Sequence, residues 1–190
     1  MVFHIKYILW RFSVKPVGRR LPGFILPWLS ILGFSGLAAA QPVGAEMPDS
    51  APLFAARLAD LNDQPVALAG LQGKPLIINF WARWCGPCRD EIPEFIKVQQ
   101  KFKTQELTVV GIAIDDKTEA VGDFAKAYEI NYSVLVAKDA GLELMRKLGN
   151  SRAGLPYTLV IDRSGKVIAK KIGLMKRPEI DAALEVLFKR

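Results

Sequence analysis

The only two cysteines of the 190-residue chain, Cys85 and Cys88, are separated by a Gly-Pro dipeptide. They follow the apolar run 76–81 and open a segment with helical spacing of apolar residues. A cysteine at the start of a helix is stabilised as the reactive thiolate, because unpaired backbone N–H groups and the positive end of the helix dipole face it. A disulfide between these two residues closes a very short loop, which forms and breaks without remodelling the fold. We therefore predict a reversible redox pair.

Other uses of the two cysteines fit the sequence less well. A structural zinc site needs four ligands, and the single histidine, His4, lies in the N-terminal leader. Covalent haem attachment needs a histidine directly after Cys88, where Arg89 stands. A purely structural disulfide would gain little, since its stabilisation grows with loop length. We expect no metal and no cofactor apart from the redox-active disulfide itself.

The first 40 residues have the pattern of an export signal. Five basic residues without an acid are followed by an uncharged stretch, 21–45, that contains small residues at 38–40 ahead of Gln41. The stretch is nearly long enough to span a bilayer, although its prolines and glycines weaken a continuous helix. The expected location is periplasmic or otherwise extracytoplasmic. The protein would be soluble after cleavage, or anchored to the inner membrane if the leader stays attached.

The formal charge of +7 belongs mainly to this leader. Beyond its five basic residues, 21 basic residues face 19 acidic ones, so a nucleic-acid surface has little support. In an oxidising compartment a surface dithiol tends to end as a disulfide. A reductant that works there needs another protein to recharge it, so a partner is implied.

The remaining chain indicates a linker, 41–52, rich in proline, glycine and serine, and one domain, 53–190. A hairpin is expected within 54–71. Further strands are expected at 76–81, 107–114, 134–136, 158–161 and 167–170, and helices after the cysteines and at 118–128, 141–148 and 178–188. Asp115 and Asp116 are expected at the positive end of the helix 118–128. Strands that alternate with helices and close in a hairpin predict a mixed sheet covered by helices.

The domain resembles the thioredoxin fold and, more narrowly, the exported TlpA/ResA group of thiol-disulfide oxidoreductases. Three features carry the resemblance: the run from Asn79 to Cys88, Glu91 and Pro93 at fixed steps beyond it, and the run Gly154 to Thr158 before a strand. Together they cover the chain from about residue 53 to 189. The expected fold class is α/β, a thioredoxin-like fold with a mixed central sheet flanked by helices and an N-terminal β-hairpin extension.

The resemblance also assigns roles to single residues. Cys85 is the expected attacking thiolate and Cys88 the resolving thiol. Pro156 is expected in the cis form facing the sulfurs, although without the resemblance a trans proline in a loop would be the better prediction. Substrate contacts are expected at Trp84, Pro87 and the backbone of Leu155. Trp81, on the strand, is expected to be ordinary packing.

Glu91 lies three residues after Cys88, on the same helix face, where a carboxylate can accept the proton of the resolving thiol. Ordinary thioredoxins use a buried aspartate on the preceding strand, at the position that Asn79 occupies here. The alternative is a solvated glutamate that merely favours the helix dipole. Arg83 and Arg89 are charged neighbours that would favour a thiolate, with solvated surface arginines as the default.

The Gly-Pro dipeptide is that of thioredoxin, whose potential near about −270 mV is far more reducing than the roughly −120 mV of DsbA. The resemblance implies that electrons pass from a membrane thiol donor protein to disulfides of exported apoproteins, during cytochrome c or oxidase copper-site maturation. One alternative is a Cu(I)-binding metallochaperone that uses the same two thiolates, although it lacks a histidine ligand outside the leader. Another is a thiol peroxidase of the same fold, which normally has a different motif.

Overall fold

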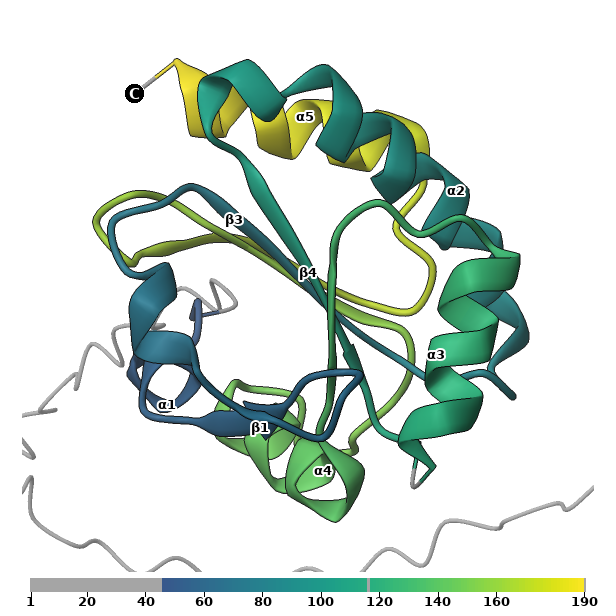
Figure 1. Ribbon diagram of the computed structural model, residues 1–190. Helices are drawn as coiled ribbons and strands as arrows, with labels where there is room; N and C mark the ends of the chain where they lie inside the picture. Colours follow the sequence, from purple (N-terminus) through teal and green to yellow (C-terminus); the bar gives the residue numbers. More distant parts are fainter. Residues whose placement is uncertain (1–45, 116, 190) are drawn as a thin grey trace, which may run out of the picture. The chain divides into compact units, whose positions relative to one another are not determined.

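A seven-stranded mixed sheet organises the part of the chain that the computed structural model describes, residues 46–115 and 117–189 (Figure 1). The strands are β1 (Arg57–Ala59), β2 (Pro65–Ala67), β3 (Leu76–Trp81), β4 (Thr108–Ala113), β5 (Ser133–Val136), β6 (Tyr157–Ile161) and β7 (Val167–Ile172). They lie in the order β2-β1-β5-β4-β3-β6-β7. The central strands β3, β4 and β5 are parallel, and the other pairs are antiparallel. The predicted sheet and both predicted hairpins are confirmed.

Helices cover both faces of this sheet (Figure 1). They are α1 (Ala51–Phe54), α2 (Gly86–Lys101), α3 (Thr118–Ala127), α4 (Lys138–Lys147) and α5 (Arg177–Phe188), with two short 3-10 turns, η1 (Leu68–Leu71) and η2 (Lys103–Gln105). α2, α3 and α5 pack against one face, and α1 and α4 against the other. The predicted α/β class, with a mixed sheet flanked by helices, is therefore confirmed.

β3 is the central element, and all six of its residues are buried. Because successive side chains of a strand point to opposite faces, Ile77, Asn79 and Trp81 face α2 and its neighbours, while the alternate residues face α4. Burial on both faces explains why this strand is recognisable as an unbroken apolar run.

One edge of the sheet brings together segments that are far apart in sequence. The parallel strands β3 and β4 end there, so the chain that leaves β3 reaches the cysteines at this edge. β6 runs the other way, and its first residue, Tyr157, pairs with Phe80 of β3. The residue before it, Pro156, therefore lies at the same edge as the start of α2.

The domain begins at the opposite edge. The hydroxyl of Ser50 donates to the carbonyl of Gly165 in the β6–β7 turn over 2.5 Å. α1 starts at Ala51, inside the range 41–52 that the sequence indicated as a linker. The predicted signal segment, 1–40, and the first linker residues lie outside the described residues. Among the helices that are described, none combines the length and the apolar composition needed to cross a bilayer.

Candidate active site

The cysteine pair lies where β3 passes into α2. Cys85 is the N-cap of α2, and Pro87 occupies its first turn, where a missing N–H group costs no helical hydrogen bond. The backbone N–H of Cys88 donates to Cys85 Sγ over 3.3 Å. The predicted place of this sulfur at the positive end of the helix is therefore confirmed.

A disulfide joins Cys85 to Cys88, and their Cα atoms are 5.3 Å apart. Cys85 is 6% exposed and Cys88 is fully buried. Thiol-disulfide exchange requires the incoming sulfur to reach the sulfur that it attacks. Within the pair, only Cys85 keeps exposed surface in the described structure.

Glu91 lies one helical turn after Cys88 and is only 1% exposed. Its Oε1 accepts a hydrogen bond from Asn79 Nδ2 over 2.5 Å, and its Oε2 accepts one from the backbone N–H of Met175 over 3.0 Å. Asn79 Nδ2 also donates to Thr158 Oγ1 over 3.0 Å. The alternative of a solvated glutamate is therefore wrong, because the carboxyl is buried and bound by Asn79 of β3 and by the backbone of Met175, in the loop before α5.

Burial raises the pKa of the Glu91 carboxyl from 4.5 to about 7, although the hydrogen bonds from Met175 and Asn79 act in the opposite direction. A base works best when its pKa lies near the working pH, and a free thiol titrates near about 8.5. Glu91 thus has the proton affinity that a proton acceptor needs, and it lies one helical turn from Cys88.

The peptide bond between Leu155 and Pro156 is cis, as expected. Three hydrogen bonds fix this loop. The side chain of the buried Asn150 donates to the carbonyl of Gly154 over 2.8 Å and accepts from its N–H over 3.2 Å, and the N–H of Gly173 donates to the carbonyl of Pro156 over 2.8 Å. In the described structure, no hydrogen bond engages the backbone of Leu155. That backbone is free to pair with another chain.

Arg83 is held by Asp115, which follows β4. The backbone N–H of Arg83 donates to Asp115 Oδ2 over 3.0 Å, and its Nε lies 3.1 Å from Oδ1, at ion-pair distance but not aligned as a hydrogen bond. Asp115 therefore holds the segment before Cys85, in addition to preceding α3 as expected. The charge of Asp115 also compensates that of Arg83. Arg89 is exposed, its guanidinium reaches back toward Gly86, and among the described residues no carboxylate pairs with it.

The surface around Cys85 is apolar. Trp84 is 70% exposed, Pro87 is exposed, and Leu155 is partly exposed. Trp81 is fully buried in the core, as expected for a packing residue. The structure therefore places the three predicted contact residues at the same edge of the sheet as the reachable sulfur.

Several residues of the site were not predicted from the sequence. Asp115, Asn150 and Thr158 each support a predicted residue, and Met175 contributes only its backbone N–H. For Asp115 a signal existed, since it follows the strand parallel to β3 and had to lie near the cysteine loop. The contacts of Asn150 and Met175 depend on loop conformation, which leaves no pattern in the sequence.

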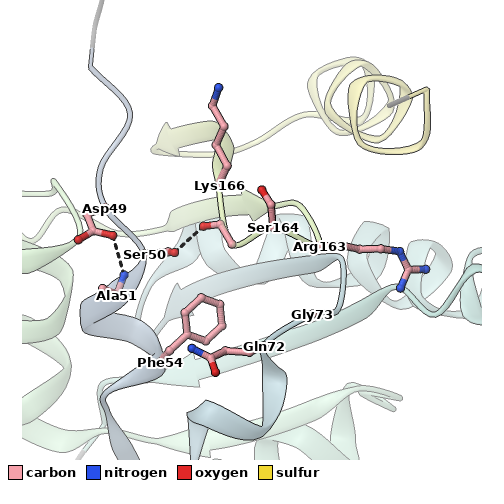
Figure 2. Close-up of a pocket in the computed structure, with 10 residues that line it drawn as sticks. Asp49, Ser50, Ala51, Phe54, Gln72, Gly73, Arg163, Ser164 and Lys166 are labelled. Atoms are coloured by element: carbon pink, nitrogen blue, oxygen red, sulfur yellow. Dashed lines mark hydrogen bonds between the residues drawn. The ribbon is translucent and has the colours of Figure 1, made fainter.

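A pocket of about 490 Å³ lies at the opposite edge of the sheet, between α1, the loop before β3 and the β6–β7 turn (Figure 2). Phe54 and the Ser50–Gly165 hydrogen bond form part of its wall. Neither cysteine lines it. The redox pair therefore lies outside this pocket, beside the exposed Trp84.

Known proteins share both the sequence pattern and the fold. Residues 42–187 match the Redoxin family. The thiol-disulfide oxidoreductase ResA of Bacillus subtilis is 31% identical over 156 residues, which cover 80% of this chain and 83% of ResA. ResA of Bacillus cereus is 29% identical over 154 residues, with the same coverage of both chains.

Solved structures of related proteins have the same fold. A thioredoxin-family thiol:disulfide interchange protein from Chlorobium tepidum superposes with a TM-score of 0.62 at 30% identity, covering 75% of this chain and 97% of that one. A secreted Mycobacterium tuberculosis disulfide oxidoreductase, described as homologous to DsbE of E. coli, superposes with a TM-score of 0.60 at 25% identity and covers 70% of this chain and 97% of that one.

The sheet order, the disulfide at the start of α2 and the cis proline at the same edge of the sheet define a thioredoxin-fold thiol-disulfide oxidoreductase. More narrowly, the chain belongs to the Redoxin family and is a TlpA/ResA-like member of the thioredoxin fold.

Proposed function

We propose that this protein is an extracytoplasmic reductant of disulfides in exported proteins. One observation carries the proposal: the Cys85–Cys88 disulfide is reachable only at Cys85, while the buried Glu91, with a pKa of about 7, lies one turn from Cys88. This arrangement separates a sulfur that meets the partner from a sulfur that closes the reaction.

The exchange proceeds in two steps. In the reduced protein, the Cys85 thiolate attacks one sulfur of the client disulfide, and the other client sulfur leaves as a thiolate. Glu91 then takes the proton of Cys88, and the Cys88 thiolate attacks Cys85 Sγ and displaces the client. Two electrons pass to the client, and the Cys85–Cys88 disulfide is re-formed.

The direction of the exchange rests on the Gly-Pro dipeptide and on the expected compartment. Thioredoxin, with the same dipeptide, has a potential of about −270 mV. Outside the cytoplasm a membrane thiol donor protein would supply the electrons, because no soluble reductant pool exists there. The expected clients are apoproteins whose cysteines must be reduced before haem or copper is attached, as in cytochrome c and oxidase maturation.

The location is part of this proposal. Its support is the export pattern in residues 1–40 and the similarity to a secreted disulfide oxidoreductase of Mycobacterium tuberculosis. A cleaved leader would release the domain, and an intact one would tether it to the inner membrane.

Mixed-disulfide trapping tests the proposal directly. Without its resolving thiol, a Cys88→Ser protein expressed in cells should accumulate covalent adducts through Cys85 that disappear on treatment with dithiothreitol. Mass spectrometry of the adducts should identify exported proteins with cysteine pairs and one membrane protein as donor. A Cys85→Ser protein is the matched control and should trap little, because Cys88 is fully buried.

Two outcomes would count against the proposal. If adducts formed equally well through Cys88 in the Cys85→Ser protein, the assignment of Cys85 as the attacking cysteine and Cys88 as the resolving one would be wrong. A reduced protein that binds Cu(I) tightly but fails to reduce insulin disulfides would favour the metallochaperone.

A further inference from the structure

Asn79 connects two polar side chains inside the domain. It is fully buried, and its Nδ2 donates to Glu91 Oε1 over 2.5 Å and to Thr158 Oγ1 over 3.0 Å. The second contact follows from the sheet register, because Asn79 of β3 pairs with Thr158 of β6. The other end of the amide is different. Asn79 Oδ1 is a buried acceptor without a hydrogen-bond partner in the described structure, and such an atom is costly enough to require an explanation.

Both partners of this amide can change their hydrogen-bonding role. The hydroxyl of Thr158 can accept and donate, and the Glu91 carboxyl accepts when it is ionised and donates one O–H when it is protonated. Asn150 is the other buried asparagine of the described residues, and it donates to the carbonyl of Gly154 and accepts from the N–H of Gly154. Backbone groups cannot exchange these roles, so the Asn150 amide has one favourable orientation. The Asn79 amide has two.

The arrangement in the described structure suits an ionised Glu91. Each carboxyl oxygen accepts an N–H, Oε1 from Asn79 and Oε2 from the backbone of Met175. A protonated carboxyl has to donate its O–H, and a backbone N–H cannot accept it. The proton therefore belongs on Oε1, whose partner in the described structure is the Asn79 amide. Within that amide only Oδ1 can accept, and Oδ1 is the atom without a partner.

We propose that the Asn79 amide is a two-position switch that follows the proton of Glu91. When the carboxyl is ionised, Nδ2 faces it, as in the described structure. When Oε1 carries a proton, the amide turns over, Oδ1 accepts the Glu91 O–H, and the Thr158 hydroxyl donates to the same Oδ1. Either orientation leaves one end of the amide without a partner, so neither one locks the side chain.

The surroundings of Glu91 allow both protonation states near neutral pH. Cys88 lies one turn earlier on α2, and Tyr132, from the loop before β5, senses the charge of Glu91. Lys176, next to Met175, is exposed to solvent, and the buried residues of α5 are all apolar. Burial brings the pKa of Glu91 to about 7, so both orientations of the amide are populated at the working pH.

The consequence for catalysis rests on the proposed function, in which Glu91 accepts the proton of Cys88. The proton leaves the Cys88 thiol and binds Glu91 Oε1, and the turned amide of Asn79 gives the new O–H its acceptor. Asn79 is then a positioning residue, because it acts through Glu91 and not on the client. The switch itself needs no client, so it can be tested in the oxidised protein.

The test is an NMR titration of the oxidised full chain between pH 5 and 9, where the disulfide does not titrate. At pH 9, a hydrogen-bond scalar coupling should join Asn79 Nδ2 to the carboxyl carbon of Glu91. The coupling should be lost at pH 5, with the midpoint of the Glu91 titration, around pH 7. Asn150 is the internal control, and its amide shifts should stay constant because backbone groups hold both ends.

Glu91→Gln provides a second readout, since the new side-chain nitrogen donates where the protonated Oε1 donates. The Asn79 amide of this variant should stay close to the low-pH form of the wild type and should not titrate.

Two results would overturn the switch: a coupling that persists at pH 5 in the wild type, or an Asn79 amide in Glu91→Gln that matches the high-pH form. The proposed function fails on a different measurement. If Glu91→Gln leaves the pH dependence of client release unchanged, Glu91 is not the proton acceptor, whichever way the Asn79 amide behaves.

Discussion

At the scale of single residues, the site depends on the contrast between two carboxyls on α2. Glu91 is buried and bound by Asn79 and Met175, whereas Glu94, one turn later, forms ion pairs with Lys97 and Arg177 that lower its pKa. Only a carboxyl whose pKa is raised toward neutrality can exchange a proton with a thiol at working pH.

Glu91→Gln should therefore change how the second exchange step depends on pH. In the wild type, the closing attack of Cys88 should accelerate as Glu91 ionises around pH 7. The variant should lose this rise, and its rate should follow the Cys88 thiol alone. Stopped-flow measurement of client release between pH 5 and 9 checks this.

Glu94→Gln is the control for that experiment and should keep the wild-type profile, since the lowered pKa of Glu94 lies outside the measured range. A Glu91→Gln profile that overlays the wild type would remove Glu91 from the chemistry and leave it a structural residue.

At the scale of elements, the cis-proline loop is held by the side chain of Asn150 in addition to the backbone bond from Gly173 to Pro156. Asn150 is fully buried and makes two hydrogen bonds to Gly154. It thereby fixes the loop that presents the free backbone of Leu155.

Asn150→Ala should destabilise the protein by about 1–3 kcal/mol, because it leaves buried backbone groups of Gly154 without partners. Denaturant unfolding measures this loss. Asn131→Ala is the matched control: it removes an exposed asparagine that donates to the Ile96 carbonyl, and should cost less than about 0.5 kcal/mol. Equal losses in the two variants would mean that Asn150 does not hold the loop.

Most elements could be predicted because their patterns are local. The run 76–81 is apolar throughout because both faces of β3 are buried, and α5 shows Ile180, Leu184 and Leu187 on one stripe. The burial of Glu91 could not be predicted from a local pattern. Its burial depends on Met175, 84 positions away, and on Thr158, which reaches it only through Asn79. Asp115 reaches Arg83 only because β3 and β4 are parallel neighbours.

At the scale of the whole molecule, the chain enters the domain at one edge of the sheet and does its chemistry at the other. Ser50 is bound to the β6–β7 turn, whereas Cys85 lies at the far end of β3. The exposed Trp84 is therefore remote from the first residues of the domain.

The raised pKa of Glu91 also affects global stability. A carboxyl whose pKa is higher in the folded than in the unfolded state keeps its proton preferentially in the folded state, so stability falls as pH rises from about 4.5 to about 7. The full effect is about 3 kcal/mol. Unfolding of oxidised wild type and Glu91→Gln should therefore diverge in favour of the variant between pH 5 and 8. A constant difference across that range would contradict the raised pKa.

The central claim is that Cys85 and Cys88 form a reversible two-electron couple poised for reduction. Its most direct measurement is the equilibrium of the pair with dithiothreitol and glutathione buffers of known potential, read by alkylation and mass analysis. We predict one two-electron transition near the thioredoxin value of about −270 mV. A transition near about −120 mV, or a pair that does not interconvert, would contradict the account.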